Sequence, residues 1–279
     1  MPTIVERDVK IETGTSLHIR EAAGAPGPDG RLTPLVCIHG FSLSGLIYER
    51  LLAGLPAGYR AIAVDQRGFG DSARPPAGYT IPEFAADNAA LLDALGIDRA
   101  VVMGHSYGGM VAQQFAVAYP ERLLALVPVG TWAHVPPAFG LGEDVGSRLE
   151  LWRTRGNVPE AFTGRIERYV LARNVTAEEK ARFLAIAMGA GTTALIETLT
   201  DIYTRPCLTL DQLAAIRAPT LVMAGAEDTI ITVPAARRLA DAIPGSELVV
   251  ISDSGHTPMW EQPRAFAGAL FGFLARHGL

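Results

Sequence analysis

The fold is decided by one stretch, Val101-Val102-Met103-Gly104-His105-Ser106-Tyr107-Gly108-Gly109-Met110. It begins as a short apolar strand, turns sharply at a serine and continues as a helix of small residues. This context gives a Gly-x-Ser-x-Gly pattern its chemical meaning, that of a nucleophile elbow. Gly104 and Gly108 flank the serine where larger side chains would collide, and Gly109 would let the helix lie close to the sheet.

Two roles are open to Ser106 at this turn. At an elbow, its oxygen points out above the carboxyl edge of the sheet, and the N-terminus of the following helix offers backbone N–H groups to developing negative charge. That geometry suits acyl transfer. Alternatively, a glycine-rich turn ends a buried strand and Ser106 only caps the helix, which is a common role for serine. The rest of the chain has to decide between these roles.

The composition is that of a globular protein, with 49% hydrophobic and 19% charged residues. A chain of 279 residues suffices for one large α/β domain, or for a core with an insertion. Its net charge of −5 offers no basic surface to nucleic acid or to an anionic membrane. Neither a signal-peptide pattern nor an apolar run of membrane-spanning length is found in the sequence. We therefore expect a soluble cytoplasmic protein whose partner is a small-molecule substrate.

Apolar patterns predict a sheet of about eight strands. Residues 3–12 and 15–21 alternate apolar and polar side chains around Gly14, as in an antiparallel hairpin at a sheet edge. Later runs are continuously apolar, which is typical of parallel strands that helices cover on both faces. These runs are 35–38, 61–64, 100–103, 123–129, 220–223 and 248–251.

Helical patterns alternate with these strands and predict a doubly wound, mostly parallel α/β sheet. The expected helices are 44–52, 81–95, 107–118, 233–242 and 261–275. The alternation is lost over residues 132–207, which form an insertion of amphipathic helices. These are expected over 145–154, 159–172 and 178–188. The predicted core therefore consists of residues 1–131 and 208–279.

Polar residues follow five of the predicted strands. In an open α/β sheet, ligands bind at the carboxyl ends of the strands, so these residues should meet at one edge. The groups are His39-Gly40-Phe41, Asp65 to Ser72, the turn at Ser106, Glu227-Asp228, and Asp253 to Pro258.

With these residues in this order, the chain resembles the α/β-hydrolase fold family over essentially its full length. The resemblance implies a catalytic triad of Ser106, Asp228 and His256. It also implies that the backbone N–H groups of Phe41 and Tyr107 form the oxyanion hole, and that the insertion is a helical cap. A serine hydroxyl is a poor nucleophile near neutral pH, so the histidine would take its proton while the aspartate holds the imidazole.

Other polar residues have more modest interpretations. Glu227 adjoins Asp228 and could be the acid, but the family pattern favours the second acidic position. Asp65 and Arg67 are expected to brace their loop, and His105 to support the elbow from beneath. No His, Asp and Glu set at ligand spacing is present in the sequence, so neither a metal nor another cofactor is expected.

The predicted cap carries 9 basic and 9 acidic residues over positions 132–207, and it is rich in Trp, Phe, Leu and Met. It offers neither a steering field for anions nor a phosphate clamp, so apolar contact should dominate recognition. Trp132 follows the strand that ends near Val129, and Ile230 lies two residues after Asp228. We expect both side chains to border the cap and the triad as substrate-binding residues.

These observations predict a cofactor-free serine hydrolase that cleaves a carboxylic ester or lactone with a sizeable apolar portion. Serine at position 106 argues against haloalkane dehalogenase and epoxide hydrolase chemistry, for which the resemblance implies an aspartate. The resemblance leaves open a carbon–carbon bond hydrolase of the meta-cleavage type, a perhydrolase, a hydroxynitrile lyase and a small-molecule receptor, because fold does not settle function. The particular substrate and the oligomeric state are not predicted.

Overall fold

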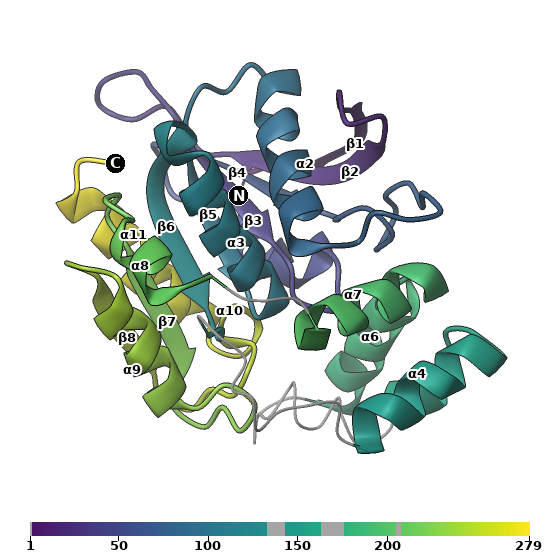
Figure 1. Ribbon diagram of the computed structural model, residues 1–279. Helices are drawn as coiled ribbons and strands as arrows, with labels where there is room; N and C mark the ends of the chain where they lie inside the picture. Colours follow the sequence, from purple (N-terminus) through teal and green to yellow (C-terminus); the bar gives the residue numbers. More distant parts are fainter. Residues whose placement is uncertain (1, 133–142, 163–175, 205–207) are drawn as a thin grey trace.

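A single sheet of eight strands forms the centre of the computed structural model, which describes residues 2–132, 143–162, 176–204 and 208–279 (Figure 1). The strands are β1 (Val5–Lys10), β2 (Ser16–Ala23), β3 (Thr33–Ile38), β4 (Tyr59–Val64), β5 (Ala100–His105), β6 (Leu123–Val129), β7 (Leu221–Gly225) and β8 (Glu247–Ile251). Their order is β1-β2-β4-β3-β5-β6-β7-β8. Strand β2 pairs antiparallel with β1 and with β4, and the other pairs are parallel. The predicted edge hairpin and mostly parallel sheet are confirmed.

Helices cover both faces of this sheet. They are η1 (Gly45–Tyr48), α1 (Glu49–Ala53), α2 (Ile81–Ala94), α3 (Tyr107–Ala118), η2 (Pro120–Arg122), α8 (Leu210–Ala214), α9 (Val233–Ala242), α10 (Pro258–Glu261) and α11 (Pro263–Arg276). Successive strand residues face opposite layers. Val102 packs in the apolar cluster of α2, α3 and α9, whereas Val101 and Met103 pack in that of α1 and α11. The apolar strands are buried on both faces for this reason.

Two helix predictions differ from the structure. The helix predicted over 44–52 is a 3-10 turn, η1, followed by the short helix α1. The helix predicted over about 261–275 corresponds to α11, which begins at Pro263, and it is separated by one residue from α10, which ends at Glu261. The steric demand of Pro263 on the preceding residue accounts for the break: Gln262 has φ −129° and ψ 59°, outside the helical region.

Within the described part of residues 132–207, four helical elements precede α8, as the predicted insertion requires: α4 (Glu143–Arg155), η4 (Pro159–Phe162), α6 (Ala177–Met188) and α7 (Thr192–Thr204). In Figure 1, α4, α6 and α7 group together beside the sheet. Of the helix predicted over 159–172, residues 159–162 form η4, and residues 163–172 lie outside the described part. The limits of the insertion, 132 and 207, stay predictions. Within the described ranges no single helix could cross a membrane, and only α6 with α7, bent by 92°, meets the length and composition required.

Polar contacts join the insertion to the loop after β4. Between α6 and α7, the N–H of Gly191 donates to the carbonyl of Gly68 at 2.7 Å. Arg74, further along the same loop, donates from Nη2 to the carbonyl of Gly189 at 2.8 Å. Both contacts use backbone atoms of the insertion. Charged side chains of α6 add contacts with α1, because Glu179 pairs with Arg50 and Arg182 pairs with Glu49. Both kinds of contact set the position of the insertion beside the core.

Buried ion pairs hold the loop after β4 to the rest of the core. The guanidinium of Arg67 donates to both carboxylate oxygens of Asp87 on α2, whose side chain is 0% exposed. Arg20 on β2 donates from Nη1 to Asp65 Oδ1 at 2.8 Å. Asp65 and Arg67 thus brace this loop, as expected.

Replacing Asp87 with Asn should destabilise the fold strongly. The substitution keeps the shape of the side chain but leaves the guanidinium of Arg67 without its counter-charge, which costs roughly 3 kcal/mol for a buried pair. The matched control is Asp93→Asn on the same helix, because Asp93 pairs with Arg122 at 2.7 Å with its side chain 51% exposed. That exposed pair should contribute less than about 1 kcal/mol. Urea denaturation measures both values, and equal losses would contradict the prediction.

Candidate active site

The turn at Ser106 has the geometry of a nucleophile elbow. Ser106 lies between β5 and α3 with φ 51° and ψ −118°, and its N–H donates to the carbonyl of Val129 at 2.8 Å. A Cβ at Gly104 would lie 2.0 Å from the carbonyl oxygen of Gly108, and one at Gly108 would lie 2.4 Å from that of His39. Real Cβ atoms do not approach so closely, so the prediction that both positions need glycine is confirmed.

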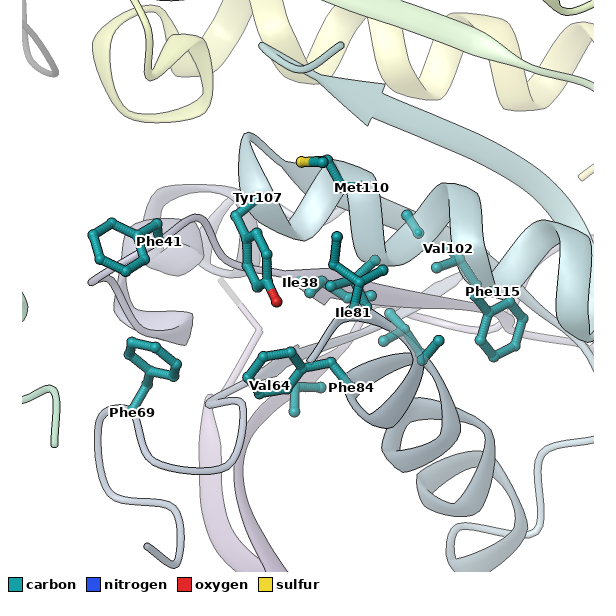
Figure 2. Packing of buried hydrophobic residues seen from close by; sticks show 14 of the residues in the cluster. Ile38, Phe41, Val64, Phe69, Ile81, Phe84, Val102, Tyr107, Met110 and Phe115 are labelled. Carbon is teal, nitrogen blue, oxygen red and sulfur yellow. The ribbon is translucent and has the colours of Figure 1, made fainter. Parts of the chain in front are cut away.

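The loop after β3 lies directly against this elbow. A Cβ at Gly40 would lie 3.2 Å from the Cβ of Ser106. Phe41 follows Gly40 in this loop and Tyr107 follows Ser106 at the start of α3, so two different elements bring these residues near the serine. Figure 2 shows their rings at the end of the apolar cluster where α3 begins. The backbone N–H of Tyr107 belongs to the first turn of the helix, where N–H groups have no helical acceptor and the helix dipole favours negative charge.

An imidazole and a carboxylate are paired beneath the carboxyl ends of β7 and β8. His256 Nδ1 lies 2.8 Å from Asp228 Oδ2, and both side chains are 0% exposed. The other carboxylate oxygen, Oδ1, accepts from the N–H groups of Ile230 at 2.8 Å and Ile231 at 2.9 Å. Because a carboxylate only accepts hydrogen bonds, Nδ1 carries the proton and Nε2 is the basic nitrogen.

The elbow and this pair are in contact through two residues. His105, immediately before Ser106, donates from Nε2 to the carbonyl of His256 at 2.8 Å, and the two imidazole rings are 4.7 Å apart. A Cβ at Gly130 would lie 3.5 Å from His256 Nδ1 and 3.6 Å from Asp228 Oδ2. The structure therefore places the His256–Asp228 pair against the residue that precedes Ser106, and the contact of Ser106 itself with His256 stays a prediction.

Tight backbone packing joins the loops that carry the acid and the histidine. A Cβ at Gly225, the last residue of β7, would lie 1.9 Å from the carbonyl oxygen of Gly255. Beside it, the N–H of Glu227 donates to the carbonyl of Ser254 at 2.8 Å. The carboxylate that contacts His256 is that of Asp228, the second acidic position of this loop.

Two further histidines are buried near the site. His39 Nδ1 donates to the carbonyl of Gly40 at 2.8 Å, while Nε2 accepts from the N–H of Gln66 at 3.0 Å. Burial lowers the pKa of His39 and, more strongly, that of His105, which the neighbouring His256 lowers further. Both are neutral supports of their loops. Within the described residues, no group of three or more His, Cys, Asp or Glu side chains could hold a metal ion.

The two predicted substrate-binding residues, Trp132 and Ile230, follow different strands, β6 and β7. Ile230 is half-buried, next to the acid that its N–H binds. Trp132 is half-buried, and its carbonyl accepts from Gln113 Nε2 at 3.1 Å. On the insertion side, the ring of Trp152 lies 6.0 Å from that of Phe41. Whether Trp132 and Ile230 touch substrate stays a prediction.

Sequence reasoning missed Glu261, whose carboxylate accepts from the backbone N–H groups of Gly255 and Thr257 on either side of His256. The local sequence indicates this role only weakly. Glu261 is the last residue of the short helix α10, and its role arises because the chain folds back there toward the loop of His256.

The family model of the alpha/beta hydrolase fold matches residues 33–263. The chain belongs to this family and is a hydrolase of this fold. It is 33% identical to a putative carbamate hydrolase, RutD, of Variovorax paradoxus, over 81% of this chain and 85% of the relative. It is 30% identical to 3-oxoadipate enol-lactonase 2 of Acinetobacter baylyi, with 82% and 84% covered. A thermophilic esterase from Thermogutta terrifontis has a similar structure, with a TM-score of 0.83, 28% identity and 99% of both chains covered.

The buried histidines should make stability depend on pH. Burial lowers the pKa of His39 from the ordinary 6.5. Below about pH 6.5 the unfolded chain therefore binds a proton at this histidine that the folded chain does not bind. Stability is therefore full above that pH and falls as the pH drops, by up to about 1.4 kcal/mol per pH unit for each such group. Melting temperatures between pH 7.5 and 5.5 should fall less steeply in His39→Asn.

The control for this measurement is His277→Asn at the C-terminal end of α11, where the ring is 36% exposed. Because this substitution leaves the burial of His39 in place, the slope should stay steeper than in His39→Asn. Equal slopes in all three proteins would contradict the assignment of the pH dependence to His39.

Proposed function

We propose that this hydrolase cleaves a carboxylic ester or lactone with a sizeable apolar portion, through an acyl-enzyme on Ser106. The observation that carries the proposal is the fully buried His256–Asp228 pair, 2.8 Å apart, whose histidine touches the residue before the elbow serine. A pair of this kind is what a serine hydroxyl needs to become nucleophilic.

The roles follow from the hydrogen bonds. Asp228 holds Nδ1–H, so Nε2 of His256 accepts the hydroxyl proton of Ser106 as its oxygen attacks the carbonyl carbon. The backbone N–H groups of Phe41 and Tyr107 stabilise the oxyanion. The imidazolium then gives its proton to the leaving oxygen, and the acyl group stays on the serine. Water repeats the sequence, with the same histidine as base, to release the acid.

An apolar substrate suits the surroundings of the proposed oxyanion hole. The ring of Phe41 lies 6.0 Å from that of Trp152, which lies 6.3 Å from that of Phe162. The insertion is neutral in total, with 9 basic and 9 acidic residues over positions 132–207. The relatives named an esterase and an enol-lactonase support the same choice of bond. The relative named a putative carbamate hydrolase makes carbamates a necessary part of the substrate panel.

A fluorophosphonate probe tests the nucleophile. Intact mass spectrometry should show one adduct, and peptide mapping should place it on Ser106. The Ser106→Ala variant should form none and should lose turnover of esters, lactones and carbamates alike. An adduct on Ser72 or Ser254, or none on the folded protein, would show that the nucleophile is wrongly assigned.

The acid is tested in the same assay. Asp228→Asn should lower kcat by roughly 10³-fold or more, because the wrong imidazole tautomer is then favoured. The control, Glu227→Gln, should keep most activity, since its neighbour is the carboxylate that contacts His256. Equal losses in the two variants would remove the reason for preferring Asp228.

Truncation of Trp132 tests the apolar contact. Trp132→Ala should lower kcat/KM for bulky esters by about tenfold more than for an acetate ester, because remote binding energy orients the reacting carbonyl. The control is Tyr119→Ala, a half-buried aromatic residue just beyond the far end of α3. Equal effects on small and bulky esters would exclude Trp132 from the substrate site. Slow ester turnover with rapid cleavage of a vinylogous diketone would instead favour a carbon–carbon hydrolase, and tight binding without turnover a receptor.

A further inference from the structure

The loop that carries His256 is held by more than the bond between its ring and Asp228. The carboxylate of Glu261 accepts from the N–H of Gly255 at 2.8 Å through Oε2. Its other oxygen, Oε1, accepts from the N–H of Thr257 at 2.9 Å and from the hydroxyl of Thr257 at 3.0 Å. One carboxylate thus binds the backbone on both sides of the histidine.

A second side chain binds the backbone of His256 itself. The neutral ring of His105 donates from Nε2 to the carbonyl of His256 at 2.8 Å. We call Glu261 and His105 together the histidine-loop clamp. Its two members hold successive backbone groups of residues 255–257: two N–H groups by the carboxylate and the carbonyl between them by the imidazole. Because His105 precedes Ser106, the clamp also ties this loop to the elbow.

The base of the clamp is itself fixed. Glu261 ends α10, and the preceding residue, Trp260, is fully buried. Arg50 donates from Nη1 to the carbonyl of Trp260 at 2.6 Å, and its guanidinium carbon lies 4.8 Å from the centre of the indole ring. The guanidinium carbon of Arg182 on α6 lies 5.8 Å from the same ring. A carboxylate anchored in this way can hold a loop in place, because it does not move with that loop.

We propose that Glu261 is a positioning residue, which sets the place of the His256 ring by fixing the backbone on both sides of it. The inference rests on the proposed function, in which this imidazole is the general base. The bond to Asp228 orients the ring but leaves the backbone of the loop free to shift. Without the carboxylate, the buried N–H groups of Gly255 and Thr257 lose their acceptor, and the loop has to move to find another.

The test is Glu261→Gln, which keeps the size of the side chain. A glutamine has one acceptor oxygen and turns an NH₂ group toward one of the two N–H donors, so one side of the clamp opens. We expect kcat to fall by about 10²-fold, since small displacements of a catalytic group are costly, while KM stays within about twofold. The low-field NMR resonance of the proton between His256 Nδ1 and Asp228 should shift or broaden. The resonance is measured without substrate.

Asp87→Asn is the matched control, because it also replaces a buried, hydrogen-bonded carboxylate by its amide. The partner of Asp87 is Arg67, and not the loop that carries His256. It should lower the melting temperature but keep both kcat and the resonance. If Glu261→Gln keeps kcat and the resonance, or if the two variants lose activity in proportion to their loss of stability, the proposal is wrong.

The test of Glu261 can be decided separately from the test of the proposed function. If the unsubstituted protein neither turns over any ester nor forms a fluorophosphonate adduct, the hydrolase proposal fails. The resonance still decides the role of Glu261 in that case. A shifted or broadened resonance in Glu261→Gln supports positioning of the imidazole, and an unchanged resonance overturns it.

Discussion

The strand-to-helix turn at Ser106 is the constraint on which the site depends. With φ 51° and ψ −118°, this residue lies in a region that L-amino acids avoid, at a cost of about 1–3 kcal/mol. The strain persists because the surroundings leave no alternative: Gly104 and Gly108 have no space for a Cβ, and Val129 accepts the N–H of the serine. Three neighbouring strands, β3, β5 and β6, therefore determine one side-chain position.

The second polar arrangement, the His256–Asp228 pair, is stable for a different reason. A buried carboxylate costs several kcal/mol unless hydrogen bonds replace its hydration. Asp228 receives three: one from the imidazole and two from the N–H groups of Ile230 and Ile231. These bonds fix both the carboxylate and the tautomer before any substrate arrives. In the proposed reaction, the site then needs no reorganisation when charge develops.

The sequence predicts the features that local chemistry determines. The strand at 100–103, the helix at 107–118 and the need for glycine at the elbow follow from side-chain size and apolar pattern, and the order of Ser106, Asp228 and His256 follows from the family's order. The structure adds the features that depend on how the chain folds back on itself. The local pattern predicts Glu261 as the start of a helix, because nothing in it shows that its carboxylate meets Gly255 and Thr257. The packing of the insertion against the core is equally non-local.

The insertion places an aromatic ring, Trp152, beside Phe41, and the buried guanidinium of Arg148 lies 5.9 Å from that ring. The contacts of the insertion with the loop after β4 use the backbone of Gly189 and Gly191, and the residue beside Phe41 is the uncharged Trp152. Exclusion of water from a site strengthens the hydrogen bonds made to developing charge inside it. The rings of Phe41 and Trp152 would contribute to that exclusion at the proposed oxyanion hole. The same arrangement leaves dispersion and burial as the means of recognising substrate, and these act on the bulk of an acyl or alcohol group without specifying its shape closely.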